Sequence, residues 1–586
     1  MEVLARNLGD LMYLGINLSH DASAVLIDDR GAVLYAVSEE RLSRVKNHIG
    51  IPLLAIEEIL DNFDIKNLDK VIIGSHEHLT SDTVHRFLAQ ENSNPSNPRG
   101  RALDPFPGFK VTTKNPKTVL SDFLKSTSKL NLNSEFIFLN HHDSHLGCGI
   151  PLLNQESGLI LSLDGEGDGE SGAISLKKKN EKLLKLARFS SLDSLGLLYA
   201  AVTKKYNFKP LHHEGKITGL AAYGEYSSMV DELLKFVIVE KGRISLRYSK
   251  SRLMRALGKT SHSFGIKSVT PLSIDHIIEM LDDSNTNYPD LAFAIQFVLE
   301  KSVEEIARYW IGQTGVHNIS LTGGVFANVK VNQKLSEMDE VEKVFVFPNM
   351  GDGGIAIGGV WSWMENNELK ITEDAFSSMY LGTREDVRLQ YKKSTDLVVT
   401  DFHEDEVATQ IAKDISSSKV VAVINGSMEF GPRALGNTSI LLDPRDPEIV
   451  KSVNLRLKRT EFMPFAPSVM EEHFYDYFET ANQSLQPFYY MAMTCNVTLD
   501  KRKLIPAVTH IDGTARPQIV SKSSNLFFHR IINSFWHLTG IPVLVNTSFN
   551  IHEEPIIRSA ETAIIALRQK AVDIVYVGNS RVTLLS

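Results

Sequence analysis

Two histidines and two aspartates of this chain have the types and the spacing of a metal-binding set. His141 and His145 are four residues apart, so that on a helix both imidazoles project from one face. Asp164 and Asp352 each come after an apolar run of strand type, and each is followed by a glycine. Imidazole nitrogens with carboxylate oxygens suit Fe(II), Mn(II) or Zn(II). The four residues therefore predict a divalent metal site, although such histidine pairs and Asp-Gly turns also occur without any ion.

A glycine-rich turn is a candidate for binding a nucleotide. Gly323 and Gly324 follow a strand-like run, and Asn328 comes shortly after them. Glycines let backbone N–H groups approach a phosphate closely, so this turn is a candidate platform for phosphate or adenine. A single Gly-Gly pair is a weak signal by itself. The only internal repeat that we find in the sequence is a short one, the Gly-Asp-Gly turns at 167–169 and 351–353. Two such turns at strand ends are expected of a duplicated phosphate-binding fold, although the signal is weak alone.

The C-terminal third carries cations and hydroxyl groups close to glycine and proline. Arg433 lies in the rigid turn GPRALG, Lys458 and Arg516 follow later, and Ser548 belongs to the segment NTSFN after an apolar strand. Several cations with Ser or Thr hydroxyl groups on converging loops form a pocket for phosphate or carboxylate. Each arginine alone is better explained as a solvated or ion-paired residue, so the pocket hypothesis depends on the loops meeting.

Strands and helices must alternate to position these residues. Residues 11–16, 22–27 and 32–37 are predicted to form an antiparallel meander, followed by a helix at 53–63. Further strands are predicted at 136–139, 159–163, 173–176, 319–321, 344–347, 420–424, 543–545 and 574–577, with helices at 291–310, 406–415 and 559–570. The polar stretch at 365–374 predicts a domain boundary, and the Asn/Pro-rich stretch at 92–117 predicts a long loop that is a candidate lid. The pattern is that of an α/β protein.

Length and composition exclude several classes of protein. At 586 residues the chain predicts at least two domains, and 43% hydrophobic with 23% charged residues excludes global disorder. The net charge of 62 − 71 = −9 argues against a general basic surface for nucleic acid. Cys148 and Cys495 are the only cysteines, which excludes a disulfide scaffold and suits a reducing compartment. No apolar run of membrane-spanning length and no signal-peptide pattern occur, so we expect a cytoplasmic protein without membrane contact.

Collinear motifs along nearly the whole chain resemble one enzyme family. Residues 17–24 (NLSHDASA), 39–41, 141–145, 164–165, 214–224 and 323–324 are similar to NodU/CmcH-type O-carbamoyltransferases. The same holds for residues 351–354, 428–436 (MEFGPRALG), 463–467, and 546–550 (NTSFN) with 554–555. The GPRALG and NTSFN motifs are highly specific together. Within that family, the resemblance is to antibiotic carbamoyltransferases of the tobramycin and ansamitocin type.

That resemblance implies a two-domain architecture and a two-step reaction. Residues 1–368 would form a TsaD/Kae-like domain of the actin/hexokinase superfamily, with a duplicated RNase H-like fold, and residues 369–586 a YrdC-like α/β domain. The C-terminal domain would convert carbamoyl phosphate and ATP, with Mg²⁺, into carbamoyl adenylate, releasing phosphate and pyrophosphate. The N-terminal domain would transfer the carbamoyl group to a small-molecule alcohol. A homodimer is expected from the family alone.

The resemblance also assigns roles to single positions. His141, His145, Asp164 and Asp352 would hold a divalent metal, typically iron, and His20 would be the general base beside the acceptor hydroxyl. Gly323, Gly324 and Asn328 would contact the adenylate. Carbamoyl phosphate and ATP would be bound by Arg433, Lys458, Arg516 and Ser548. Many relatives carry arginine where this chain has Met463, which weakens the alignment at Lys458.

Two other functions use similar modules. A tRNA threonylcarbamoyl-adenosine synthase would share both domains, but the net charge of −9 disfavours tRNA as a partner. A non-catalytic, nucleotide-gated regulator would need the glycine-rich turns and would have no use for a pocket around Arg433. Release of pyrophosphate that depends on carbamoyl phosphate would exclude the regulator. The sequence does not name the acceptor alcohol.

Overall fold

The computed structural model describes residues 11–63, 68–75, 121, 124–125, 134–153, 156–247, 288–373, 375–383, 395–458, 465–551 and 553–585. The chain divides into two compact units, which we call unit 1 (residues 1–331 and 338–377) and unit 2 (residues 332–337 and 378–586). Both units combine helices with mixed β-sheets, so the α/β class that the sequence predicts is confirmed. The predicted loop at 92–117 and Met463 lie outside the described residues. Within the described ranges, no helix combines the length and the apolar character needed to cross a bilayer.

The first sheet of unit 1 is five-stranded, in the order β3-β2-β1-β4-β5. Its strands are β1 (Met12–Asn17), β2 (Ser23–Asp28), β3 (Val33–Ser38), β4 (Lys70–Ile73) and β5 (Glu135–Phe138). β1 pairs antiparallel with β2, and β2 with β3, whereas β4 and β5 continue from β1 in parallel. Helices α1 (Glu39–Ser43) and α2 (Leu53–Phe63) follow the meander, and α2 packs its apolar face on the core of this sheet. The predicted meander and helix are confirmed.

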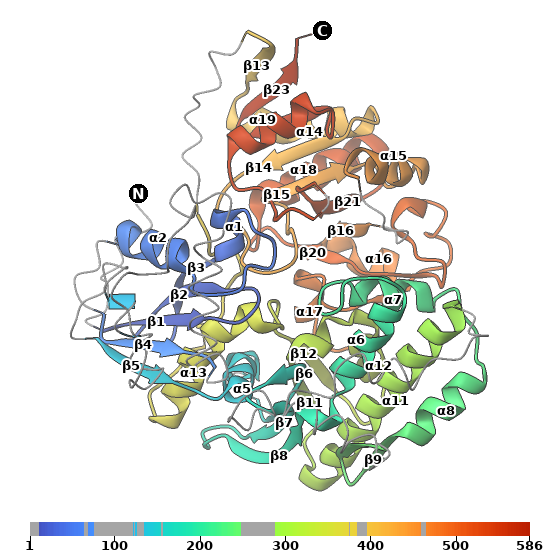
Figure 1. The fold of residues 1–586 in the computed structure, drawn as a ribbon. Coiled ribbons are helices and arrows are strands. Elements are labelled where there is room, and N and C mark those ends of the chain that lie inside the picture. The colour runs from blue at the N-terminus through green and yellow to red at the C-terminus, as the bar shows by residue number, and fades with distance from the viewer. Residues whose placement is uncertain are drawn as a thin grey trace. The chain divides into compact units, whose positions relative to one another are not determined.

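The second sheet of unit 1 repeats this topology in the order β12-β11-β6-β7-β8. Its strands are β6 (Gly158–Gly167), β7 (Glu170–Lys177), β8 (Leu184–Ser190), β11 (Asn318–Thr322) and β12 (Lys343–Val346). β6, β7 and β8 form the antiparallel meander, and β11 and β12 continue from β6 in parallel. The two sheets, blue and cyan to green in Figure 1, are thus two copies of one strand pattern. The two Gly-Asp-Gly turns are not counterparts in this duplication, because both follow strands of the second sheet: 167–169 joins β6 to β7, and 351–353 follows β12.

Two helices at equivalent places in the two sheets cross at very short range. α5 (His141–Leu153) follows β5, and α13 (Ile355–Asn366) follows β12 after the short helix η4 (Asp352–Gly354). A Cβ atom added to Gly147 would lie 1.9 Å from the carbonyl oxygen of Gly358, and one added to Gly358 would lie 2.0 Å from that of Ser144. The two backbones therefore touch, and only glycine fits at the crossing.

The remaining elements of unit 1 are mostly helical and pack beside the second sheet. They are η2 (Ser191–Asp193), α6 (Leu195–Lys205), α7 (Glu214–Ala221), α8 (Ser228–Phe236), β9 (Val237–Glu240), β10 (Arg243–Leu246), α11 (Tyr288–Thr314) and η3 (Gly324–Ala327). The next helix, α12 (Val329–Ser336), begins in unit 1, and its residues from Asn332 onward belong to unit 2. Buried hydrogen bonds join α6, α7 and α11: the hydroxyl of Tyr199 lies 2.9 Å from Thr218 Oγ1 and donates to Gln296 Oε1 at 2.8 Å. The predicted helix at 291–310 is confirmed inside the longer α11.

Unit 2 is built on an eight-stranded mixed sheet, in the order β13-β23-β22-β14-β15-β21-β16-β20. Its strands are β13 (Leu397–Asp401), β14 (Val421–Ile424), β15 (Thr438–Leu442), β16 (Ala466–Met470), β20 (Gln518–Val520), β21 (Val543–Ser548), β22 (Ile574–Val577) and β23 (Ser580–Leu584). Its helices include α14 (Glu404–Ser416), α15 (Glu448–Arg456), α18 (Leu526–Thr539) and α19 (Ala560–Arg568). The strands and helices predicted for the C-terminal part are confirmed to within two residues at nearly every end.

A smaller sheet completes unit 2, in the order β17-β18-β19. It is formed by β17 (Phe478–Glu479), β18 (Cys495–Val497) and β19 (Thr514–Ala515), with the short helices η6 (Glu471–His473), α16 (Phe474–Tyr477), α17 (Gln486–Tyr489) and η7 (Pro506–Val508) around it. β19 leads through Arg516 and Pro517 directly into β20 of the large sheet. Arg516 therefore lies in the short link between the two sheets.

Candidate metal centre and anion pocket

Four buried side chains of unit 1 converge on one point. The Nε2 atoms of His141 and His145 lie 3.1 Å apart, and one ligand atom from each of His141, His145, Asp164 and Asp352 lies within 4.8 Å of the others. All four residues are almost completely inaccessible to solvent. The structure thus brings together the four residues that the sequence singles out as metal ligands, although they come from segments about 200 residues apart.

The start of α5 explains why the two histidines point the same way. The side chain of Asp168 accepts the backbone N–H of His141 at 2.7 Å, and Asn140 Oδ1 accepts that of Asp143 at 3.1 Å. These bonds satisfy N–H groups that have no partner inside the helix, so α5 begins at His141 and places His145 one turn later on the same face. Gly167 leaves room for the His141 ring, because a Cβ atom there would lie 2.2 Å from His141 Cγ.

Each aspartate uses one oxygen for the protein and turns the other toward the histidines. Asp164 Oδ1 accepts the N–H of Gly324 at 2.8 Å, while its Oδ2 lies 3.4 Å from His141 Nε2. Asp352 Oδ2 accepts the hydroxyl of Ser19 at 2.6 Å, while its Oδ1 lies 3.4 Å from His141 Nε2 and 3.5 Å from His145 Nε2. Within the described residues, Asp352 Oδ1 is buried without a hydrogen-bond partner. An orphaned carboxylate oxygen facing two imidazoles fits a divalent cation.

The protonation of the cluster reflects its negative charge. Burial lowers the pKa of His141, but the carboxylates of Asp352 and Asp164 outweigh this effect and hold it well above its usual value. Burial raises the pKa of Asp352, but His20, His141 and His145 outweigh it and hold the pKa well below the usual range. Without a metal ion, protons therefore balance the two carboxylates.

We expect metal affinity to increase with pH. Because the raised pKa keeps His141 protonated near neutral pH, a metal ion must displace that proton, and acidification strengthens the competition. The apparent affinity should fall about tenfold per pH unit for each proton released. Titration calorimetry with Mn²⁺ or Zn²⁺ in two buffers of different ionisation enthalpy measures the proton count directly. A buffer-independent heat and a pH-independent affinity would contradict this prediction.

His20 lies beside the cluster on the loop after β1. Its Nδ1 is 3.0 Å from Asp21 Oδ2, and its Nε2 is 3.3 Å from Asp352 Oδ2. Asn47 donates to the other oxygen of Asp21 at 2.7 Å. Burial lowers the pKa of His20, but Asp352 and Asp21 together raise it to about 10. Asn47 and Asp21 thus orient the ring so that Nε2 faces the candidate metal centre.

Sequence reasoning did not assign roles to Ser19, Asp21 or Asn47. Ser19 and Asp21 lie in the motif NLSHDASA directly beside His20, so adjacency was the available signal. Asn17 shapes this loop, because its Oδ1 accepts the N–H of Ser19 at 2.9 Å and lies 2.7 Å from Ser19 Oγ. Asn47 is 26 residues from Asp21, and no local pattern connects them.

The predicted nucleotide contacts have partners within the protein. The N–H of Gly324 is directed at Asp164, and that of Gly323 donates to the carbonyl of Met350 at 2.7 Å. Asn328 Nδ2 donates to Gln296 Oε1 at 2.7 Å, and its Oδ1 accepts backbone N–H groups at the start of α12. These hydrogen bonds give Gly323, Gly324 and Asn328 a structural role in unit 1. Their contact with an adenylate stays a prediction.

In unit 2, three of the four predicted anion-binding residues flank one buried network of hydrogen bonds. Asn546 Nδ2 donates to the carbonyl of Ala434 at 3.2 Å and to Gln518 Oε1 at 2.9 Å. Gln518 Nε2 donates to the carbonyl of Leu435 at 2.8 Å. Arg433, Arg516 and Ser548 each stand within two residues of a member of this network. The three loops that carry Arg433, Arg516 and Ser548 therefore meet, as the pocket hypothesis requires of them.

Lys458 lies on the surface of unit 2. It is exposed, follows α15 and has a left-handed backbone with φ of 56°. The residues that connect it to β16, 459–464, are outside the described ranges. Its part in anion binding stays a prediction.

A buried glutamate that the sequence did not single out shapes the loop that carries Arg433. Glu429 is 3% exposed, and its Oε1 accepts the N–H groups of Leu435, Asn437 and Thr438 at 2.8, 2.8 and 3.2 Å. One carboxylate oxygen thus closes the GPRALG turn from inside. The signal was the position of this glutamate in the same motif, four residues before Arg433.

We expect Glu429→Ala to destabilise unit 2, because it leaves three buried N–H groups without an acceptor. The loss should be about 2–4 kcal/mol of unfolding free energy, whereas Glu429→Gln, which keeps the acceptor oxygen, should lose clearly less. Urea unfolding of the full chain, followed by tryptophan fluorescence, compares the two variants. Equal stability of Glu429→Ala and the parent protein would show that the loop does not depend on these bonds.

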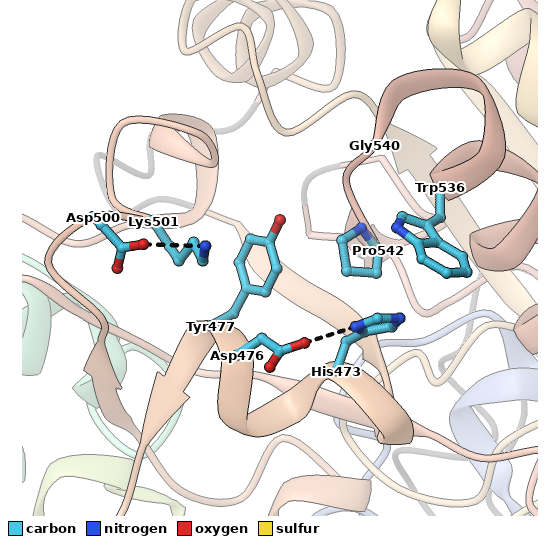
Figure 2. A pocket seen from close by; sticks show the side chains of 8 residues that line it. All are labelled: His473, Asp476, Tyr477, Asp500, Lys501, Trp536, Gly540 and Pro542. Carbon is cyan, nitrogen blue, oxygen red and sulfur yellow. Dashed lines mark hydrogen bonds and ion pairs between the residues drawn. The ribbon is translucent and has the colours of Figure 1, made fainter.

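A polar hollow of about 350 Å³ lies elsewhere on unit 2 (Figure 2). It is lined by His473, Asp476, Tyr477, Asp500, Lys501, Trp536, Gly540 and Pro542. Figure 2 shows that its charged groups pair with one another: His473 lies 2.8 Å from Asp476, and Lys501 lies 3.1 Å from Asp500. None of the residues predicted to bind substrate lines this hollow.

Comparison with known proteins gives matches along most of the chain. The family model "Carbamoyltransferase N-terminus" matches residues 12–360, and "Carbamoyltransferase C-terminus" matches residues 412–583. Nodulation protein NolNO of Sinorhizobium fredii is 33% identical over 96% of this chain and 78% of its own length. Nodulation protein U of the same species is 31% identical over 42% of each chain. The solved structure of HypF from T. kodakarensis is 15% identical, covers 62% of this chain and 48% of its own, and has a TM-score of 0.34.

Proposed function

Because the chain belongs to the carbamoyltransferase family and is a carbamoyltransferase enzyme, we propose that it is an ATP-dependent O-carbamoyltransferase acting on a small-molecule natural product. In unit 2, water cleaves carbamoyl phosphate into carbamate and phosphate; the carbamate oxygen then attacks the α-phosphorus of ATP, which forms carbamoyl adenylate and releases pyrophosphate. In unit 1, the hydroxyl oxygen of the acceptor attacks the carbamoyl carbon, the bond to AMP breaks, and AMP leaves. Carbamate is a poor electrophile, so a mixed anhydride with AMP supplies the good leaving group.

The observation that carries this proposal is the buried cluster of two histidines and two aspartates beside His20. His141, His145, Asp164 and Asp352 would hold a divalent cation, with Fe²⁺ as the first choice and Mn²⁺ or Zn²⁺ as alternatives. When bound, such a cation offsets the negative charge of the adenylate phosphate and of the leaving AMP. The orphaned oxygen of Asp352 and the one oxygen that each aspartate turns toward the histidines support this assignment.

His20 would take the proton from the acceptor hydroxyl on its Nε2. Asp21 is 3.0 Å from Nδ1, which favours the tautomer with the proton on Nδ1 and leaves Nε2 as the base. The high pKa of His20 comes in large part from Asp352, so it decreases when that carboxylate shares its charge with a cation. The base would then be available near neutral pH.

The activating step belongs in this proposal to the pocket around Arg433. Arg433, Arg516 and Ser548, with Lys458, would bind the phosphate groups of ATP and carbamoyl phosphate, Mg²⁺ accompanying ATP. The convergence of their loops on Asn546 and Gln518 supports this role. Two separate sites in one chain would keep the water-sensitive anhydride from forming where the acceptor site is open.

The finer architecture is part of the same proposal. The repeated strand pattern of unit 1 supports a TsaD/Kae-like domain with a duplicated RNase H-like fold. We assign unit 2 to the YrdC-like class. A homodimer follows from the resemblance to NodU/CmcH-type enzymes, and a cytoplasmic location from the low cysteine content, which suits a reducing compartment.

Two measurements test the proposal. The protein is incubated with ATP, Mg²⁺ and carbamoyl phosphate, and pyrophosphate release is compared with and without carbamoyl phosphate. Small-molecule alcohols extracted from the producing cell are then added, and mass spectrometry searches for products that gain one carbamoyl group. Pyrophosphate release that does not depend on carbamoyl phosphate would refute the adenylate mechanism, and carbamoylated tRNA would replace the natural-product acceptor.

A further inference from the structure

Leu211 of unit 1 combines two properties that the fold does not require. Its backbone is left-handed, with φ of 64°, and its side chain is 47% exposed. Leucine is rarely found in this region of backbone space, which glycine and asparagine occupy more easily. An exposed leucine also adds little to a core. A strained, exposed apolar residue is therefore a candidate for a role in binding.

Hydrogen bonds hold the loop around Leu211 in this conformation. The N–H of Leu211 donates to Glu214 Oε1 at 2.6 Å, at the start of α7. The N–H of Lys209 donates to His213 Nδ1 at 3.1 Å, and that of His213 donates to the carbonyl of Lys209 at 3.0 Å. The exposed leucine is thus presented by a fixed turn.

The turn presents Leu211 beside the candidate metal centre. A Cβ atom added to Gly165 would lie 3.6 Å from Leu211 Cδ2 and 3.8 Å from Leu197 Cδ2, so these leucines stand over the glycine that follows Asp164. Gly165 follows Asp164, whose ligand atom lies within 4.8 Å of that of Asp352, and Asp352 Oδ2 lies 3.3 Å from His20 Nε2. Leu211 therefore stands over backbone that adjoins the group of side chains around His20.

We propose that Leu211 determines acceptor specificity by packing on an apolar face of the alcohol next to the hydroxyl that is carbamoylated. This inference rests on the proposed function. With its hydroxyl at His20, the acceptor has Leu211 and Gly165 beside its carbon skeleton. Alkyl or ring CH groups bury favourably against leucine, whereas a skeleton with a hydroxyl on every carbon would leave polar groups without partners there. The class of acceptor is thus an alcohol whose neighbouring carbons are not hydroxylated.

Two simple alcohols test this proposal as probes. Cyclohexanol has an apolar ring, and myo-inositol has a hydroxyl on every ring carbon. The full-length protein with bound metal, ATP and carbamoyl phosphate should carbamoylate cyclohexanol with the higher kcat/KM. Leu211→Ser should decrease kcat/KM for cyclohexanol about tenfold, mainly through KM, while pyrophosphate release stays within about twofold. Leu184→Ser, which changes a 56% exposed leucine of β8, should leave the preference between the alcohols unchanged.

A second variant separates binding from stability. Leu211→Gly relieves the strain of a left-handed backbone at a leucine, so its unfolding temperature should be equal to or above that of the parent protein. Its kcat/KM for cyclohexanol should decrease as it does in Leu211→Ser. Preference for myo-inositol, reaction with neither alcohol while pyrophosphate is released, or an unchanged preference in both variants would overturn the proposal. A decrease in unfolding temperature with the preference intact would assign Leu211 a structural role instead. If the parent protein releases no pyrophosphate with ATP and carbamoyl phosphate, the proposed function itself is refuted.

Discussion

His141→Ala should abolish transfer of the carbamoyl group to the alcohol while pyrophosphate release that depends on carbamoyl phosphate continues. The variant removes the nitrogen that lies within 3.4 Å of both aspartates and 3.1 Å from His145 Nε2. Mutation of a residue that only hydrogen-bonds to a metal ligand decreases metal affinity or activity about 10–100-fold. Removal of a direct ligand should therefore decrease transfer by more than about 100-fold. The metal content after gel filtration, measured by plasma mass spectrometry, should fall together with transfer.

Two further variants make this result specific. His145→Ala removes the second imidazole and should behave in the same way. His317→Ala removes an exposed histidine of unit 1 whose Nδ1 lies 2.8 Å from the carbonyl of Glu340, and it should retain both metal and transfer. Full metal content in His141→Ala would refute the ligand assignment. Loss of pyrophosphate release in the same variant would show that the cluster serves the first step.

Arg433→Ala should have the opposite effect. Pyrophosphate release should fall about 100-fold or more, because an arginine that binds phosphate makes charge-assisted hydrogen bonds worth about 1.5–3 kcal/mol each. Transfer from carbamoyl adenylate that is supplied directly should continue, since the metal cluster lies in unit 1 and is unchanged. Rapid-quench measurement of each half-reaction separates the two steps.

Arg568→Ala is the matched control for this variant. Arg568 also belongs to unit 2, but it forms an exposed ion pair with Asp396 at 2.8 Å, and such pairs contribute little because water and salt screen them. Both half-reactions should therefore persist. If His141→Ala and Arg433→Ala fail at the same step, the assignment of two chemical sites to two units is wrong.

Local pattern predicted much of the fold. The helix at residues 53–63 is α2 with the same bounds, and the three-stranded meander is β1 to β3, because apolar spacing and turn residues are local signals. The strand that carries Asp164 was predicted to end at Leu163. In the structure, β6 continues to Gly167 through a register shift, so Asp164 lies in an irregular part of the strand. A bulge depends on the partner strand, which the sequence of one strand does not contain.

The ligand types of the candidate metal centre could also be predicted from the sequence, whereas the hydrogen bonds that orient those ligands could not. Imidazole and carboxylate types and the four-residue spacing are properties of the sequence itself. The hydroxyl of Ser19 that orients Asp352 comes from a residue 333 positions away. No periodicity connects residues at that separation, because the contact exists only after two copies of a five-stranded sheet have come together.

The amino-acid sequence by itself therefore determined which atoms are available for chemistry and which segments form strands and helices, since both follow from residue types and near neighbours. Tertiary structure alone decided which oxygen of each aspartate faces the histidines, how Glu429 closes the turn that carries Arg433, and where the strained Leu211 stands. These outcomes depend on distances between segments that are far apart in the chain. Packing sets those distances, because buried polar groups must find partners wherever the fold places them.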